Sequence, residues 1–594
     1  MHFCNLRGLH PDPDLTLGNT KLEVVPEFKF LGVIFDKKLS FLPHIKSLKK
    51  KCQKAINILR VIAHSDWGAD KKVLLRLYWS LIRSKLDYGS IVYGSARKSY
   101  LQLLDPIQNQ CLRLALGAFR TSPVNSLYAE ANEPSLYYRR EKLSLQYFLK
   151  LKSNPFNPTH RVVFNPQYKR LFQQKPNAIA PFGIRMEPII DNLGVDTDSI
   201  AQYKLSDIPP WTLDTAIFLF DLTSDKKSET DRAIFHSKYK EIKEQYSSYK
   251  PIYTDGSKDG DLVAAAAVYG ERVKKCRLPD KSSIFSAEIR AIDLALNLVE
   301  NANSTRFIIF SDSLSVLQAL SNQKLENPLV CQIIQRISHI LSSNRLVFCW
   351  LPSHTGIMGN EHADRSAKSA LNLPISDFKV PYTDFKPSIL TYITSIWQSK
   401  WNDDVFNKLH SIKPTLGEWY PSYRSVRREE VTIARIRIGH SHITHSWLLA
   451  KEGAPECIPC NAPFTIKHIL LDCIDVQRIR ARYFNVNTIY ELFDTVRIEL
   501  ILSFLKEIGV YNRLWFLTHS KYIYIYQYHF FITHYLFHIT HSLQTIYQQS
   551  LIFTNLISTF VHLLQILIYF FFKQIHFNLL IFLISIHPHH HNAR

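Results

Sequence analysis

Apolar residues in the first 150 positions recur at three- and four-residue steps. In HIKSLKKKCQKAINILRVIAH the apolar stripe consists of Ile45, Leu48, Cys52, Ile56 and Leu59, a spacing that predicts an amphipathic helix. The same periodicity predicts helices around residues 71–86 and 101–116, and KLEVVPEFKFLGVIFD predicts a hairpin of short strands. Residues 1–150 are therefore expected to be mainly helical.

The pattern changes twice further along the chain. Residues 151–250 are rich in Pro, Asn and Ser, which predicts a connector with little core of its own. Residues 251–373 then read as a β-meander followed by alternating helices and strands. This order predicts an α/β domain with a mixed five-stranded sheet and flanking helices. Residues 374–510 form a further C-terminal region.

The charge of the chain is concentrated in its first quarter. The 594 residues carry a formal net charge of +21, and residues 1–150 alone hold 24 Lys and Arg against 12 Asp and Glu. A basic excess of this size favours a nucleic-acid partner. The predicted helix around residue 50 carries a lysine face that could follow phosphates, although a merely solvated face is the alternative. Its candidate nucleic-acid contacts are Lys49, Lys50, Lys51 and Lys54.

The composition also excludes several classes of protein. With 46% hydrophobic and 21% charged residues, the chain is neither a disordered protein nor a typical membrane protein. Nine cysteines in this length argue against a disulfide-rich secreted scaffold, and no secretory signal pattern opens the chain. An intracellular protein of the nucleus or cytoplasm is expected.

Four carboxylates in residues 251–373 lie where the predicted strands end or helices run. Asp255 and Asp312 end two strands, Glu288 lies on the first helix, and Asp364 begins the last one. Each alone could be a turn, cap or surface residue. Together they can converge at one edge of the sheet, where they would repel one another unless cations were bound. Oxygen ligands favour two Mg²⁺ or Mn²⁺ ions, which can support phosphodiester hydrolysis.

These residues lie in motifs that resemble the type 1 ribonuclease H family. The similarity rests on TDGS, SAE, FSDS and WLPSHTGIMGNEHADRSAK, within about residues 251–372. The resemblance implies that the four carboxylates bind the catalytic metal ions and that His354 in the PSHTG loop assists proton transfer and product release. It places Gly256 and Ser257 near the RNA strand. The implied substrate is an RNA–DNA hybrid, not a small molecule.

A second candidate metal site lies near the C-terminal end. Cys457, Cys460, His468 and Cys473 follow the spacing C-x2-C-x7-H-x4-C, which can form a tetrahedral Zn²⁺ site in a small zinc-knuckle-like region. The alternative is a chance pair of cysteines near a buried histidine. His440, His442 and His445 in RIGHSHITHSW are interpreted as structural residues or RNA contacts.

Residues 1 to about 500 also resemble the C-terminal part of polyproteins from Jockey-type non-LTR retrotransposons. FKFLGVIFD and the helices after it are similar to the end of the reverse transcriptase and its thumb, and RIRIGHSHITHSWLL with the Cys/His motif is similar to the terminal zinc-binding region. The polymerase's Asp-Asp pair is missing, and Asp403-Asp404 falls too late to replace it. Neither polymerase activity nor a separate endonuclease domain is expected, and the sequence is interpreted as a truncated element or partial gene.

The last part of the chain, residues 511–594, has no Asp, Glu or Gly. Within it, residues 551–573 are long and apolar enough to span a bilayer, but polar residues interrupt the run. Translated non-coding sequence is the favoured interpretation, and a membrane anchor is the alternative. Besides the nuclease, two functions therefore stay open: an idle nucleic-acid-binding remnant and a membrane-tethered protein.

Overall fold

The computed structural model describes residues 2–3, 11–166, 169–174, 179–203, 212–224, 229–419 and 426–514. The predicted hairpin is present as β3 (Glu27–Phe30) and β4 (Val33–Asp36), which pair antiparallel. The predicted lysine-bearing helix is α1 (Leu42–Ile62), and its apolar stripe is buried as expected. The segment 551–573 and the rest of the tail from residue 515 on lie outside the described residues. Within the described ranges, no helix combines the length and apolar character needed to cross a bilayer.

From Leu42 to residue 150 the chain is mainly helical, as predicted. A π-helical turn at Trp79–Arg83 joins α2 to α3. The remaining helices are α2 (Lys71–Tyr78), α3 (Ser84–Asp87), α4 (Ser90–Tyr93), α5 (Lys98–Leu101), α6 (Asp105–Leu116), α7 (Val124–Ala131) and α8 (Leu136–Lys152). A short hairpin of β1 (Thr16–Leu17) and β2 (Thr20–Lys21) precedes them.

Residues 151–250, expected to be a connector with little core of its own, contain helices that pack against other parts of the chain. They form α9 (Pro158–Phe164), α10 (Lys169–Gln173) and α11 (Phe182–Leu193), and Met186 and Ile190 of α11 are buried in a core shared with α8. One of the prolines of this segment, Pro158, occupies the first turn of α9. A proline in that position favours a helix start, since its missing N–H has no intrahelical partner there.

The α/β domain contains one mixed sheet of six strands, not five. Their order is β5-β10-β9-β6-β7-β8, with β6, β7 and β8 antiparallel and the remaining pairs parallel. The extra strand, β5, pairs with β10, which would otherwise leave its outer backbone groups unpaired. The strands are β5 (Ile217–Leu219), β6 (Lys250–Asp259), β7 (Leu262–Tyr269), β8 (Arg272–Leu278), β9 (Arg306–Ser311) and β10 (Arg345–Trp350).

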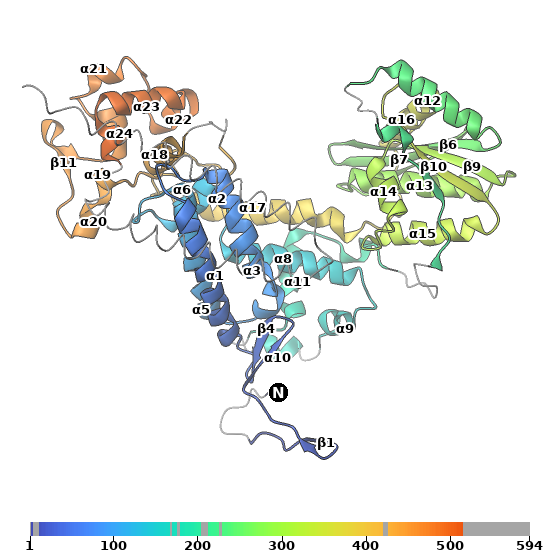
Figure 1. Cartoon of the computed structure of the whole chain (residues 1–594), viewed down its shortest axis with the longest axis horizontal. Coiled ribbons are helices and arrows are strands. Elements are labelled where there is room, and N and C mark those ends of the chain that lie inside the picture. The colour runs from blue at the N-terminus through green and yellow to red at the C-terminus, as the bar shows by residue number, and fades with distance from the viewer. Residues whose placement is uncertain are drawn as a thin grey trace, which may run out of the picture. The chain divides into compact units, whose positions relative to one another are not determined.

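Helices cover both faces of this sheet (Figure 1). One face packs against α13 (Ile284–Glu300), α14 (Leu314–Ser321) and α15 (Pro328–Leu341). The other face buries Tyr253 and Phe310 together with Phe235 of α12 (Arg232–Gln245) and Ala363 of α16 (Met358–Ala370). Alternate residues of the strands thus enter two separate cores, as the period of a strand requires.

The C-terminal region shares its core with the N-terminal helices. Trp397 and Trp401 of α17 (Lys386–Asn402) and Ile438 of α18 (Arg427–Ile438) belong to the same buried cluster as α1 and α6. The guanidinium of Arg427 donates to the carbonyl oxygens of residues 114 and 115 at the end of α6, at 2.8 and 2.7 Å. The two regions therefore share one hydrophobic core and are joined by hydrogen bonds.

The remaining elements of this region are short. They are α19 (His442–His445), α20 (Trp447–Ala450), β11 (Glu456–Cys457), β12 (Ala462–Pro463), α21 (Gln477–Arg480), α22 (Ile489–Thr495), α23 (Ile498–Glu507) and α24 (Val510–Arg513).

Candidate functional site

Three of the predicted carboxylates meet at the point where the parallel pairing of β6 and β9 ends. The last pair is Thr254 with Ser311, so Asp255 and Asp312 each follow it directly. Asp255 was expected to end its strand, but β6 continues to Asp259 because its antiparallel pairing with β7 goes on. Glu288 comes from α13, and the carboxylate oxygens of the three residues lie within 4.8 Å of one another.

The approach of Glu288 depends on a glycine in β6. A Cβ atom on Gly256 would lie 2.8 Å from the backbone nitrogen of Glu288 and 2.9 Å from Cβ of Ala287. These separations are too short for any larger residue, so Gly256 allows α13 to approach the strand closely. The backbone N–H of Gly256 donates to the Glu288 carboxylate, and Ser257 is the next residue along β6, also buried.

The environment of this cluster disfavours negative charge. Burial, followed by the charges of Asp312 and Asp364, raises the pKa of Asp255 to about 8. Burial also raises the pKa of Glu288 well above its usual value, and it raises the pKa of Asp312. Oε2 of Glu288 is buried without a hydrogen-bond partner. A buried carboxylate oxygen with no donor is costly unless a cation binds it.

Asp364 belongs to a neighbouring group on α16. It was expected to begin this helix but lies in its second turn, because the helix already starts at Met358. Its carboxylate lies within 4.8 Å of ligand atoms of His354 and Glu361. It also accepts a hydrogen bond from Nζ of Lys368 at 2.8 Å. The charge of Asp364 acts on both Asp255 and Asp312, so the two groups form one acidic site.

The family model that matches this chain is that of RNase H, over residues 247–372. The match covers all nine elements from β6 to α16, which carry or border the carboxylates. These residues form an RNase H domain. The resemblance inferred from the motifs is therefore confirmed.

Relatives from mobile elements also match this chain. The chain is 26% identical to the RNA-directed DNA polymerase from mobile element jockey of Drosophila funebris, over 25% of this chain and 16% of that protein. It is 30% identical to the Pol polyprotein from retrotransposable element R1 of Bradysia coprophila, over 18% of this chain and 10% of that protein. The chain thus matches less than a fifth of the length of either relative.

A solved structure also matches. RNase H1 from the archaeon Halobacterium salinarum is 21% identical, with a TM-score of 0.18, over 21% of this chain and 98% of that one.

Two site residues escaped the sequence analysis. Asn360 is buried and its side chain hydrogen-bonds Asp312, which opposes the rise in the pKa of that carboxyl. The carboxylate of Glu361 accepts from the backbone N–H of Gly356 at 3.2 Å, next to His354. Both residues lie in GNEHAD, where the three-residue step from Glu361 to Asp364 puts two acids on one helix face. That spacing was the available signal.

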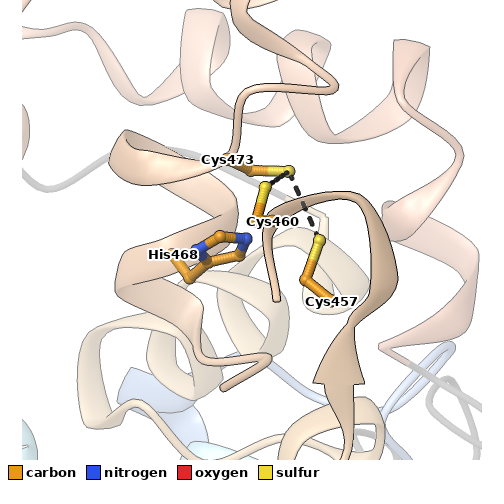
Figure 2. A group of neighbouring side chains, drawn as sticks. All are labelled: Cys457, Cys460, His468 and Cys473. Carbon is orange, nitrogen blue, oxygen red and sulfur yellow. Dashed lines mark hydrogen bonds between the residues drawn. The ribbon is translucent and has the colours of Figure 1, made fainter. Parts of the chain in front are cut away.

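The four predicted zinc ligands also come together. Figure 2 shows the side chains of Cys457, Cys460, His468 and Cys473 pointing toward one another, and their ligand atoms lie within 4.8 Å. Sγ of Cys473 lies 3.9 Å from Sγ of Cys457 and 3.8 Å from Sγ of Cys460. Tetrahedral thiolates at the usual Zn–S bond length would be about 3.8 Å apart.

Other residues noted in the sequence make contacts within the fold. Among the histidines after α18, the ring of His440 stacks on that of His445 at 3.7 Å and contacts Oγ1 of Thr121. Burial lowers the pKa of His440 to about 3 and that of His445 to about 4, so both rings are neutral and suit packing rather than phosphate binding. Asp404 accepts from Nδ2 of Asn125 at 2.9 Å, a contact between elements of the fold.

Proposed function

We propose that the chain hydrolyses the RNA strand of RNA–DNA hybrids. The observation that carries this proposal is the convergence of Asp255, Glu288 and Asp312 from three elements of an RNase H domain, with one buried carboxylate oxygen left without a partner. A stabilising role does not explain such a cluster, since burial and mutual repulsion both act against it.

The donor set fits divalent cations that prefer oxygen. Asp255, Glu288, Asp312 and Asp364 would hold two Mg²⁺ or Mn²⁺ ions. Such ions lower the pKa of a bound water and neutralise charge on the scissile phosphate and leaving oxygen. The other residues of the site would shield these carboxylates from bulk water, fix their positions and transfer protons. Asn360 fixes Asp312 by its hydrogen bond.

His354 is the proposed proton carrier. It is exposed in the loop before α16 and lies beside Glu361 and Asp364. An exposed imidazole beside two carboxylates can carry a proton between the site and solvent. Gly256 and Ser257 lie on β6 next to Asp255, a position from which they could contact the RNA strand, which its 2′-hydroxyls distinguish from DNA.

Hybrid binding would draw on the N-terminal helices. On α1, Lys50, Lys51 and Lys54 are exposed and Lys49 is half-buried, while the opposite face enters the core. The RNase H residues carry almost no net charge, so a separate basic surface is the proposed source of phosphate affinity.

Each cysteine in the described ranges is a free thiol, which agrees with an intracellular site of action in the nucleus or cytoplasm.

The test is cleavage of a hybrid labelled in its RNA strand, with Mg²⁺ and with EDTA. Asp312→Asn should lower kcat about 10³-fold or more, because it removes a metal ligand without changing the size of the side chain. Asp259→Asn is the matched control, since this exposed residue lies four positions after Asp255 on the same strand. Cleavage that persists in EDTA and in Asp312→Asn would refute the mechanism. Hybrid binding without any cleavage by the wild type would instead support an idle remnant.

We also propose that the Cys/His cluster binds Zn²⁺. Nε2 of His468 is buried without a hydrogen-bond partner, and the backbone N–H of Ile474 donates to Sγ of Cys460 and lowers the pKa of that thiol. Both features suit a closed structural zinc site. The purified chain should contain one zinc per molecule, and Cys473→Ser should lose it. Cys331→Ser, at a half-buried cysteine of α15, should keep it. Equal zinc in both variants would refute the assignment.

A further inference from the structure

Helix α12 precedes the residues matched by the RNase H family model and contacts the loop that carries His354. Nε2 of its His236 lies 2.8 Å from the carbonyl oxygen of Thr355. A carbonyl oxygen only accepts hydrogen bonds, so Nε2 of His236 is the donor. Thr355 follows His354 directly, and this contact therefore fixes the backbone next to the proposed proton carrier.

The helix is a rigid support for this contact. Phe235, the neighbour of His236, is 1% exposed and packs in the core with Phe310. One turn further, the hydroxyl of Tyr239 lies 2.5 Å from the hydroxyl of Tyr253, which stands two positions before Asp255 on β6. The strand that carries Asp255 and the helix that carries His236 are thus joined directly.

The loop needs such support because of its backbone conformation. His354 has a φ of 52°, and Gly356 has a φ of 87°. The left-handed region is unfavourable for a residue with a side chain, so surrounding contacts must hold His354 in it. On one side Glu361 accepts from the N–H of Gly356 at 3.2 Å, and on the other side His236 binds Thr355. The loop is therefore held between α16 and α12.

We propose that His236 is a positioning residue, which fixes the His354 loop through the Thr355 carbonyl so that the imidazole stays beside Glu361 and Asp364. This role rests on the proposed nuclease function. Because α12 ends before residue 247, His236 would contribute to the site from outside the residues that match the RNase H family model.

The experiment measures steady-state hybrid cleavage by the full chain. His236→Ala should lower kcat about tenfold and change KM less than twofold, because misplacing a catalytic group mainly affects the chemical step. His236→Gln should recover most of the loss, since its amide can donate to the same carbonyl. Ser237→Ala, at the exposed neighbour on α12, should behave as the wild type.

A double-mutant cycle separates positioning from general damage. In a His354→Ala background, His236→Ala should cause no further loss of kcat, because the group that it positions is gone. Hydrogen exchange should become about fivefold faster in a peptide covering residues 351–357 and stay unchanged in α13. A full further loss in the double variant, or unchanged exchange in the loop, would overturn the role of His236.

Failure of the nuclease itself gives a different result. If the wild type does not cleave hybrids, the proposed function and this role fall together. If the wild type cleaves and Asp312→Asn does not, but His236→Ala retains full kcat, only the positioning role is overturned.

Discussion

Replacing Asp255 with Asn should stabilise the metal-free chain, and the gain should be larger at pH 8 than at pH 5. The folded protein raises the pKa of this carboxyl from 3.8 to about 8, first through burial and then through the charges of Asp312 and Asp364. The side chain is 5% exposed, so solvent screens these effects weakly. Asparagine keeps the shape and a hydrogen-bonding group but cannot ionise.

The sign follows from proton linkage. Below the unfolded-state pKa, Asp255 is protonated in both the folded and the unfolded chain, and the raised pKa costs no stability. As the pH rises toward the folded-state pKa, the folded protein holds a proton that the unfolded chain has released, so the free energy of unfolding falls. From pH 5 to pH 8 the loss is at most about 4 kcal/mol, at ~1.4 kcal/mol per pH unit. Water entry and relaxation reduce this, and we expect about 2 kcal/mol.

The assay is urea unfolding of the full chain in EDTA at both pH values. A brief deuterium pulse at fixed pH then reports the unfolding of β6 and β9, separately from the helical core. The advantage of Asp255→Asn over the wild type should grow by about 2 kcal/mol between pH 5 and pH 8. With saturating Mg²⁺ the order should reverse, because the wild type gains ligand-binding free energy. Two results in EDTA at pH 8 would refute the reasoning. One is that Asp255→Asn has no higher free energy of unfolding than the wild type. The other is that Asp259→Asn gains as much as Asp255→Asn.

Two further predictions concern the regions that flank the RNase H domain. Asp384, which is 7% exposed, accepts hydrogen bonds from the backbone and side chain of Ser283 and from the hydroxyl of Ser286 at the start of α13. Asp384→Ala should lower the free energy of unfolding of α13 by about 2–3 kcal/mol in the same pulse assay, and an unchanged value would show that these bonds are replaced by water. Reversing the charge of the three exposed α1 lysines should weaken hybrid binding and reduce its salt dependence by about 0.9 per lost phosphate contact, without changing kcat at saturating hybrid. The three substitutions are Lys50→Glu, Lys51→Glu and Lys54→Glu. An unchanged slope of affinity against salt would mean that this face is simply solvated.

Short motifs made the acidic site predictable. Asp255 and Asp312 lie in motifs that follow apolar strand patterns, and Glu288 lies in a helical pattern. Residues at the ends of neighbouring parallel strands and on an adjacent helix can meet at one edge of the sheet. The Cys/His cluster was predictable for the same reason, because all four of its residues lie within 17 positions of one another. The exact extent of each element was less accurate: β6 runs past Asp255 because pairing with β7 outlasts pairing with β9.

Contacts between distant segments left no comparable signal. The sixth strand, β5, contains three residues, and so short a run becomes a strand only because the edge of β10 is available to it. The helices of residues 151–250 were missed because their prolines mark helix starts as well as linkers. The core shared by α1, α6, α17 and α18 could not be predicted either. The periodicity of an apolar helix face shows that the face is buried but does not show which other helix covers it.

The sequence by itself therefore determined which chemical groups make up the candidate sites, and the tertiary structure decided what supports them. The carboxylates, the histidine of the loop and the zinc-type ligands are chemical groups whose identity and spacing can be read along the chain. Their support comes from His236, Asp384 and Asn360, which are ordinary residues at unremarkable positions. Each becomes important only because folding brings it within hydrogen-bond distance of a site residue or its immediate neighbours, and that proximity is a property of three-dimensional packing.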